Sequence, residues 1–270
     1  MEYIQSKDNG TVKHIASLQR KKFRRQYKEY IVEGWRSVLD VLTTGQVKLI
    51  AISDEVNNEA VQAMVDAAHD AHDAQCRIVR VAAGLYRMLE ETENGQGVLA
   101  VVAQQSSDIS MFRPDACSLL IDEVQDPGNL GTILRTALAA GVTQILLTKG
   151  CVDPYNAKTV RSTMSALSKV TLFEQVTVED IKSLCTTHHL TVYATALDEA
   201  EPYRAVDYET PVLLMMGNEG RGVSDEFFAL AHRRITIPMY GPIESLNLAV
   251  ATGLCLFAIR ESIEERKRME

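Results

Sequence analysis

Three segments in the second half of the chain hold residues whose types and spacing could do chemistry. The first, residues 126–132, reads DPGNLGT and follows an apolar stretch that ends at Ile121. Proline and glycine force a turn there, and Asn129 is placed to cap the helix that follows. Arg135 falls less than two turns beyond Asn129. A plain strand–turn–helix joint with a surface cation explains the same residues, so this segment alone does not decide a function.

The second segment, residues 217–222, reads GNEGRG and follows the apolar stretch Val212–Met216. Three glycines in six residues let a backbone approach a ligand closely. The spacing differs from the GxGxxG dinucleotide fingerprint, and no GxxxxGK[ST] occurs. The carboxylate of Glu219 would repel a pyrophosphate, but it suits hydroxyl groups or a cation. The alternative is a tight turn in which Glu219 serves the N-terminus of the next helix.

The third segment, residues 237–248, reads IPMYGPIESLNL. Two prolines and a glycine constrain the turn, and Ser245 is predicted to be the N-cap of a helix over 245–265. That helix is apolar or small on nearly every side, which predicts burial within the domain or against a second subunit. Asn247 places a polar amide one turn into this buried helix, so it needs a hydrogen-bond partner.

The elements around these segments predict a parallel sheet. From residue 118 onward, continuous apolar stretches alternate with helical spacing, which is typical of a parallel sheet covered on both faces. Ligands bind such sheets at the carboxyl ends of the strands, and all three segments follow a predicted strand. The predicted strands are 118–121, 144–148, 170–173, 191–196, 212–216 and 234–238.

The first hundred residues predict a separate, smaller α/β module. Its predicted strands are 30–32, 47–53, 76–81 and 98–103, with helical spacing between them. A polar stretch, QQSSD, follows at 104–108 and indicates a linker. The expected organisation is therefore a first domain over 1–104, a linker over 105–110 and a second domain over 111–270.

Charge is distributed unevenly along the chain. The formal net charge is −8, yet residues 1–40 hold nine Lys/Arg and five Asp/Glu. Phosphate contact is local, so a basic patch can serve an acidic protein. The patch makes RNA contacts by Lys21, Lys22, Arg24 and Arg25 a hypothesis, and a solvated helix face is the alternative.

Other classes of protein lack support in the sequence. The five cysteines are dispersed with no CxxC pair, which favours reduced thiols in the cytoplasm over disulfides or a zinc site. No apolar run is long enough to span a bilayer, and the start lacks a secretory signal. The histidine pairs His69/His72 and His188/His189 lack further spaced ligands, so no metal is expected.

Taken together, the three segments resemble the motifs of a known family. DPGNLGTILRTALAAGV, LLMMGNEGRGVSDE and IPMYGPIESLNLAVATGLCLFAIR are similar, in the same order, to the three motifs of the SpoU-type (TrmH-like) branch of the SPOUT RNA 2′-O-ribose methyltransferases. The resemblance covers roughly residues 118–260. VKHI at 12–15, IVEG at 31–34 and GQGVLA at 95–100 resemble the substrate-binding module, itself similar to a ribosomal protein, that precedes this domain in many rRNA members.

The resemblance implies a fold, a cofactor and an assembly. Members have an α/β domain whose C-terminal part forms a deep trefoil knot, bind S-adenosylmethionine and complete the active site as homodimers. Asn129, Arg135, Glu219, Ser245 and Asn247 match the catalytic or structural polar positions. The positions that match the cofactor pocket are Thr195, Ala196, Gly217, Gly220, Ile237, Met239, Ser245 and Leu246.

The implied reaction is methylation of a ribose 2′-hydroxyl in structured RNA, with ribosomal RNA of the 23S type as the expected partner. The enzyme must align the hydroxyl and help to remove its proton. Arg135 matches the deprotonating residue, but a neutral guanidinium at pH 7 costs about 7 kcal/mol. We therefore expect Arg135 to hold the target phosphate and orient the hydroxyl. Ser245 and Asn247 would hold the loop and the 2′-oxygen, and Glu219 would fix the loop backbone.

Two alternatives share the fold. One is a tRNA ribose methyltransferase, although the N-terminal module favours rRNA. The other is a non-catalytic RNA-binding assembly factor, which the filled polar positions argue against. A nucleotide-dependent oxidoreductase lacks its glycine fingerprint. The stretch RSTMSAL at 161–167 departs from the Ser-Ala-Gly-Ala-like stretch of relatives, which leaves the identity of the RNA open, and Arg161 would fit RNA contact.

Overall fold

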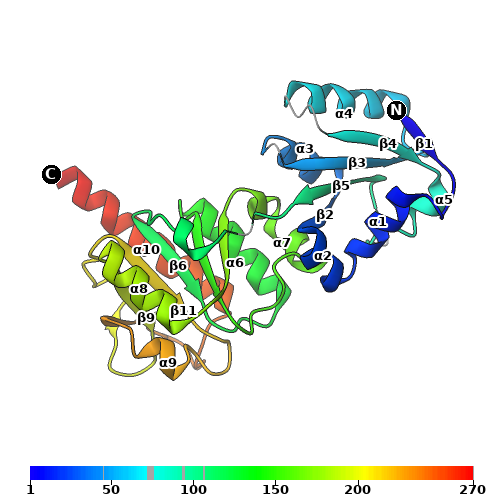
Figure 1. The fold of residues 1–270 in the computed structure, drawn as a ribbon. Coiled ribbons are helices and arrows are strands. Elements are labelled where there is room, and N and C mark those ends of the chain that lie inside the picture. The colour runs from blue at the N-terminus through cyan, green and yellow to red at the C-terminus, as the bar shows by residue number, and fades with distance from the viewer. Residues whose placement is uncertain (45, 72–75, 93–94, 106, 270) are drawn as a thin grey trace. The chain divides into compact units, whose positions relative to one another are not determined.

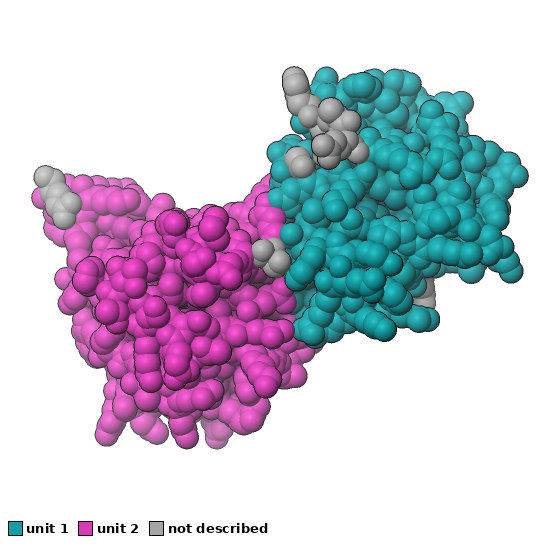
Figure 2. Space-filling view, viewed as in Figure 1, with its two compact units in different colours: residues 1–104, 153–168 teal, residues 105–152, 169–270 magenta. Residues whose placement is uncertain are grey.

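The computed structural model describes residues 1–270 except 45, 72–75, 93–94, 106 and 270. The chain forms two compact units, coloured separately in Figure 2: unit 1 comprises residues 1–104 and 153–168, and unit 2 comprises 105–152 and 169–270. The end of the first stretch coincides with the predicted boundary. Residues 153–168, which the sequence pattern assigns to the second domain, belong instead to unit 1. Residue 106 of the expected linker and His72 lie outside the described residues.

Unit 1 is built on a mixed five-stranded sheet. β1 is parallel to β4 and β4 to β3, whereas β5 is antiparallel to both of its neighbours, β3 and β2. The sequence analysis missed β1, because three residues are too few to show a period. In sheet order the strands are β1 (Glu2–Ile4), β4 (Arg77–Val81), β3 (Val47–Ser53), β5 (Val98–Ala103) and β2 (Glu29–Glu33).

Helices cover this sheet with apolar residues at helical spacing. Val12, Ile15 and Leu18 project from α1 into a core that includes Val79 and Leu99 of the sheet. α7 packs against β2, which brings residues 153–168 into unit 1. The helices of unit 1 are α1 (Gly10–Leu18), α2 (Lys21–Tyr27), α3 (Trp35–Leu42), α4 (Asn58–Asp70), α5 (Ala83–Tyr86), α7 (Ala157–Thr163) and the 3₁₀ turn Ala166–Ser168.

Unit 2 confirms the predicted parallel sheet. All seven strands run parallel, and those at the centre are buried along their whole length, as their continuous apolar sequences predict. In sheet order they are β10 (Glu201–Pro202), β12 (Arg233–Thr236), β9 (Thr191–Thr195), β11 (Val212–Met216), β6 (Cys117–Ile121), β7 (Gln144–Thr148) and β8 (Thr171–Val176).

Two layers of helices sandwich the sheet of unit 2. α8 (Val178–His188) and α9 (Asp225–Phe228) pack on one face in a core with Leu120 and Met215. α10 (Leu248–Met269) packs against α6 (Pro127–Ala139) and β11 (Figure 1). Among the described residues, no helix is both long enough and apolar enough to cross a membrane.

The order of the strands sends the chain back and forth across the sheet between β9 and α10. From β9 the chain runs to the sheet edge at β10, returns to β11 on the other side of β9, and then goes back to β12. The loop that leaves β12 must reach α10, which lies against α6 and β11. The ends of β9, β11 and β12 and the start of α10 thereby meet. The trefoil knot that the resemblance implies stays a prediction.

Candidate active site

The glycine-rich segment after β11 folds into a closed backbone hairpin. The N–H of Asn218 donates to the carbonyl of Gly222 and the N–H of Gly222 to the carbonyl of Asn218, both at 2.9 Å. A Cβ atom at Gly217 would lie 2.0 Å from backbone atoms of Gly222 and Val223, so only glycine fits there. Gly222 has φ +70°, which also favours glycine. Gly220 would meet only Asn218 Oδ1, at 3.7 Å.

The end of β6 supports this hairpin. Asn218 Nδ2 donates to the carbonyl of Glu123 at 3.0 Å, and Arg221 Nη2 lies 2.6 Å from Glu123 Oε2. Buried Asp122 accepts from the Ser224 N–H and from the Thr148 hydroxyl, both at 2.8 Å. Sequence reasoning missed Asp122, although an acidic residue that ends a wholly apolar strand is a signal for a buried, hydrogen-bonded carboxylate.

The cap of α6 differs from the prediction. Asp126 Oδ1 accepts from the N–H of Asn129 at 2.7 Å, and Pro127 is the first helical residue. Asp followed by Pro is a strong signal for N-cap and first helical position, because proline lacks the N–H that would otherwise be unpaired. Asn129 is therefore not the cap, and its side-chain amide is available for other bonds.

The cap of α10 also differs from the prediction. α10 begins at Leu248, and Asn247 Oδ1 accepts from the N–H groups of Ala249 and Val250, at 3.0 and 3.3 Å. Asn247 thus precedes the helix instead of lying one turn inside it. Ser245, the predicted cap, is exposed in the preceding loop.

Three polar residues from the three segments form one chain of hydrogen bonds. Asn247 Nδ2 donates to Asn129 Oδ1 at 2.9 Å, and Asn129 Nδ2 donates to Glu219 Oε1 at 2.8 Å. Since the backbone N–H groups of α10 occupy Asn247 Oδ1, its Nδ2 can only donate outward. The direction of every bond in the chain is therefore fixed from the helix to the Glu219 carboxylate. Glu219 lies in the glycine hairpin, so the three segments are joined.

A cavity of about 520 Å³ lies beside this chain. Its wall comes from the segments that follow β9, β11 and β12 and from the start of α10. All eight residues that the resemblance assigns to a cofactor pocket line it, namely Thr195, Ala196, Gly217, Gly220, Ile237, Met239, Ser245 and Leu246. The sequence analysis did not single out Leu197, Asp198, Asp225 or Phe228, which line it as well. Their position just beyond the same strand ends could have indicated them.

The charged residues of the cavity leave an excess of carboxylates. Asp198, Glu219, Asp225 and Glu244 line it. Its two arginines have partners of their own. Arg221 pairs with Glu123, while Arg234 pairs with Glu199 at 2.9 Å and lies over the Phe228 ring at 4.9 Å. The cavity thus favours a ligand that carries positive charge and hydroxyl groups.

Of the five predicted catalytic residues, Glu219 and Ser245 line this cavity. Arg135 lies outside its wall, as do Asn129 and Asn247. Arg135 is exposed on α6. Within the part of the chain that the structure describes, its guanidinium makes no hydrogen bond or ion pair.

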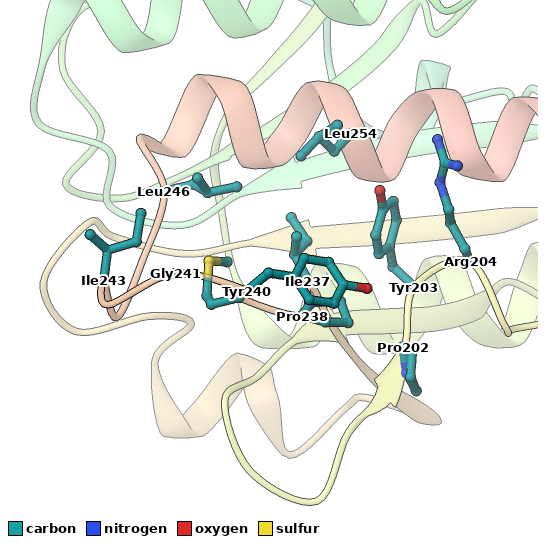
Figure 3. Close-up of a pocket in the computed structure, with 11 residues that line it drawn as sticks. Pro202, Tyr203, Arg204, Ile237, Pro238, Tyr240, Gly241, Ile243, Leu246 and Leu254 are labelled. Carbon is teal, nitrogen blue, oxygen red and sulfur yellow. The ribbon is translucent and has the colours of Figure 1, made fainter.

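A second cavity, of about 500 Å³, shares one wall with the first. Figure 3 shows Tyr203 and Arg204 on one side of it, Leu254 of α10 above, and the 237–246 loop around Tyr240. Ile237, Met239 and Leu246 line both cavities. Tyr240 is 97% exposed.

The predicted RNA-contacting residues of unit 1 fall into two groups. Lys21, Lys22 and Arg25 are exposed. Arg24 is only 6% exposed, pairs with Asp153 at 2.6 Å and donates to the carbonyls of Leu18 and Gln19. The prediction is therefore corrected for Arg24, whose side chain holds residues 153–168 to α2.

The buried thiols of unit 2 are poor nucleophiles. Burial raises the pKa of Cys117 and of Cys255 to about 12, and burial raises the pKa of Cys151 to about 11. These cysteines stay protonated at neutral pH. Among the described residues, no group of three or more His, Cys, Asp or Glu could hold a metal ion.

Comparison with known proteins assigns the family. The family model described as SpoU rRNA Methylase family matches residues 116–257. This chain belongs to that family. The match spans β6 to α10, which is the part of unit 2 that carries all three segments. A second model, described as MRM3-like substrate binding domain, matches residues 9–100 of unit 1.

Individual members of the SpoU family resemble the whole chain. The 23S rRNA (guanosine(2553)-2′-O)-methyltransferase RlmP of Bacillus subtilis (strain 168) is 32% identical, over 96% of this chain and 100% of its own. The crystal structure of an AdoMet-bound rRNA methyltransferase from Sinorhizobium meliloti has a TM-score of 0.83 at 30% identity, covering 96% of this chain and 97% of its own. The tRNA (guanosine(18)-2′-O)-methyltransferase of Thermus thermophilus is 34% identical but covers 58% of this chain and 83% of its own.

Proposed function

We propose that this SpoU family member transfers a methyl group from S-adenosylmethionine to a ribose 2′-hydroxyl of ribosomal RNA, of the 23S type. One observation carries the proposal. Residues of the second and third motif segments line one cavity, and the hydrogen-bond chain from Asn247 through Asn129 to Glu219 ties the first segment to them. The similarity to RlmP, which spans both units, supports an rRNA substrate.

The cavity suits S-adenosylmethionine in size and in chemistry. Its volume of about 520 Å³ lies in the range of ligand pockets, about 300–1,000 Å³. Apolar side chains such as Met216, Ile237 and Leu246 suit the adenine and the carbons beside the sulfur. The excess of carboxylates suits ribose hydroxyls, an ammonium group and a sulfonium. When bound, this cofactor supplies a methyl group on a positively charged sulfur, which is already a good electrophile.

The protein's own residues then have to bring the acceptor hydroxyl into line. Arg135 would grip the phosphate next to the target ribose with its planar guanidinium and orient the 2′-oxygen. Glu219, held by Asn129, fixes the hairpin beside the cavity, and Asn247 holds the start of α10. Ser245, exposed at the cavity wall, would bond to the 2′-oxygen or the loop.

A homodimer would bring Arg135 to the cavity of a second copy. This proposal rests on the exposure of Arg135 away from the cavity of its own chain. It also rests on an exposed apolar face along α10, where Val250 and Phe257 are 53% and 45% exposed beside Thr136 of α6. Large exposed apolar faces mark interfaces in soluble proteins. Phe257→Glu should be a monomer by light scattering. It should still bind S-adenosylmethionine in calorimetry but should not methylate RNA.

Cofactor binding and methyl transfer test the proposal separately. Calorimetry should detect S-adenosylmethionine binding to the wild type and to Arg135→Lys with the same affinity. Mapping of 2′-O-methyl groups should show one rRNA site that is lost in cells without the protein and restored by the wild type but not by Arg135→Lys. Near-full activity of Arg135→Lys would disprove the orienting role, since lysine keeps the charge but loses the fork.

The maps of 2′-O-methyl groups, together with cofactor binding, also test the two alternatives, a tRNA methyltransferase and a non-catalytic assembly factor. A site lost from tRNA instead of rRNA would make this a tRNA enzyme; unit 1 and its match to a substrate-binding domain support rRNA. Absence of S-adenosylmethionine binding would leave an RNA-binding assembly factor. We place the activity in the cytoplasm, in keeping with five cysteines that form no disulfide.

A further inference from the structure

Three aromatic rings form a row on the surface of unit 1. The Phe23 and Tyr27 rings, one helical turn apart on α2, are nearly parallel, with an angle of 13° and centroids 6.2 Å apart. The His14 ring of α1 meets Tyr27 edge-on at 4.8 Å. We call His14, Tyr27 and Phe23 the aromatic row. Tyr27 is 40% exposed although it is large and partly apolar, so the row is open to a ligand.

A buried carboxylate holds the aromatic row in place. Glu29, which is buried in β2, accepts His14 Nε2 at 2.6 Å through one oxygen and Lys48 Nζ at 2.8 Å through the other. His14 therefore cannot turn without losing a bond to a buried charge. Because the His14 ring supports Tyr27, the row is ordered before any ligand arrives, which lowers the entropic cost of binding.

Cations without partners surround the aromatic row. Lys21, Lys22, Arg25 and Lys28 are all exposed. None of the four makes an ion pair within the described ranges of the chain, whereas Arg24 of the same helix is buried and paired. Lys22 Nζ lies 5.9 Å from the centre of the Phe23 ring. The patch thus combines aromatic rings with four exposed cations that form no ion pair among the described residues.

We infer that the aromatic row and its cations bind an unpaired nucleotide of the substrate RNA, with the base stacked on Tyr27 and Phe23 and the flanking phosphates on Lys22 and Arg25. The inference rests on the proposed function and adds a structural requirement to its substrate. A base inside a duplex has both faces covered by its neighbours, so only a looped-out or single-stranded base can lie on such a row. The RNA must therefore carry an unpaired nucleotide in the part that unit 1 contacts.

Fluorescence anisotropy with the full-length protein tests this inference. The probes are a single-stranded ten-nucleotide RNA with 2-aminopurine at its centre and the same RNA in a perfect duplex. The wild type should bind the single strand at least tenfold more tightly and quench the 2-aminopurine. Tyr27→Leu should weaken binding about tenfold and abolish the quenching, and Tyr27→Trp should restore both.

Salt dependence separates the base contact from the phosphate contacts. Lys22→Gln with Arg25→Gln should reduce the slope of log affinity against log salt by about 1.4, at about 0.7 per contact for single strands. Tyr27→Leu should leave the slope unchanged, because stacking releases no counterions. Matched controls on unit 1 are Tyr3→Leu, another exposed tyrosine, and Lys7→Gln, another exposed lysine. Both should bind the probes as the wild type does.

Three results would overturn the inference. They are equal affinity for duplex and single strand, a loss in Tyr3→Leu as large as the loss in Tyr27→Leu, and RNA binding by Tyr27→Leu that equals the wild type's. S-adenosylmethionine binding, measured on the same samples, distinguishes a failure of this inference from a failure of the proposed function. If Tyr27→Leu binds the cofactor and RNA like the wild type, only the aromatic row is wrong, and absence of cofactor binding in the wild type would refute the enzyme itself.

Discussion

Helix α2 of unit 1 and the three motif segments of unit 2 both carry runs of polar residues, but their side chains are held in opposite ways. In unit 2, Asn129, Glu219 and Asn247 bond to one another, and only the last is fixed to a helix end. In α2, two neighbouring arginines differ. Arg24 is buried and pairs with Asp153, whereas Arg25 is exposed and forms no ion pair within the described residues.

The contrast shows when a pattern of residue types predicts where the side chains lie in the fold. Residues that depend on one another through specific bonds must all be present, so the motif as a whole predicts their convergence. A cluster of cations has no such mutual dependence, because each contributes charge independently. Whether one of them faces RNA or the core depends on its position around the helix and on what packs there.

Replacement of Arg24 by Met gives the largest expected effect. It leaves the Asp153 carboxylate, whose side chain is only 12% exposed, without its arginine partner, which costs about 3–5 kcal/mol of unfolding free energy. Trp35, the one tryptophan of the chain, lies in unit 1, so its fluorescence during urea denaturation reports this unit. Arg25→Met is the matched control and should change stability by less than about 0.5 kcal/mol. Equal losses in both variants would remove the distinction between the two arginines.

Gly217→Ala should destabilise unit 2 by about 3 kcal/mol, because the new methyl group meets backbone atoms at 2.0 Å, and backbone cannot move aside as a side chain can. S-adenosylmethionine binding should be lost in calorimetry. Gly220→Ala tests the hairpin at a matched position. Its methyl group meets only Asn218 Oδ1 at 3.7 Å, so its melting temperature should match the wild type.

Alkaline pH should weaken unit 2 before unit 1. The pKa of Cys117 and of Cys255 is raised by burial from the ordinary 9.0 to about 12. The stability that these protonated thiols contribute to unit 2 is fully present below pH 9. It falls as the pH rises towards 12, because only the unfolded chain loses these protons. At pH 10 each thiol lowers the unfolding free energy by about 1.4 kcal/mol.

In unit 1, burial raises the pKa of Tyr30 and of Tyr86 from an ordinary value of 10.0, so the corresponding loss begins one pH unit higher. Denaturation at pH 8, 9 and 10 compares the unfolding free energies of the two units. Circular dichroism follows both units, and Trp35 fluorescence follows unit 1. Cys255→Ala should reduce the loss in unit 2. A simultaneous decline of both units would contradict the assignment to the thiols.

The smallest effect tests the mutual dependence itself. A double-mutant cycle of Asn129→Ala and Glu219→Ala should show a coupling of about 0.5–1 kcal/mol in the unfolding free energy, since the two side chains share a bond of 2.8 Å. Lys22→Gln and Arg25→Gln share no partner, so their effects on stability should add within about 0.5 kcal/mol. Coupling between Lys22 and Arg25, or no coupling between Asn129 and Glu219, would contradict the distinction between mutually dependent and independent residues.

The sequence predicted the sheet of unit 2 well and the helix ends less well. β6 and β11 are continuous apolar runs, and such runs are stable only when a sheet covers both faces. The caps of α6 and α10 were wrong because Asn, Asp and Ser compete for the same role, and the choice depends on which side chain has a better partner elsewhere. Asn129 has Glu219, and Asp126 is left to cap. The trefoil knot and the catalytic role of Arg135 stay predictions.

The amino-acid sequence by itself predicted that Asn129, Glu219 and Asn247, which come from three separate segments, belong together, and one chain of hydrogen bonds joins them. Their types and spacing are set by bonds that each needs from the others. Only the tertiary structure decided that residues 153–168 belong to the first unit, that Arg24 holds them there, and that Tyr27 of the aromatic row stays exposed. The physical reason is that burial depends on contacts between segments far apart in the chain, and a local pattern carries no record of them.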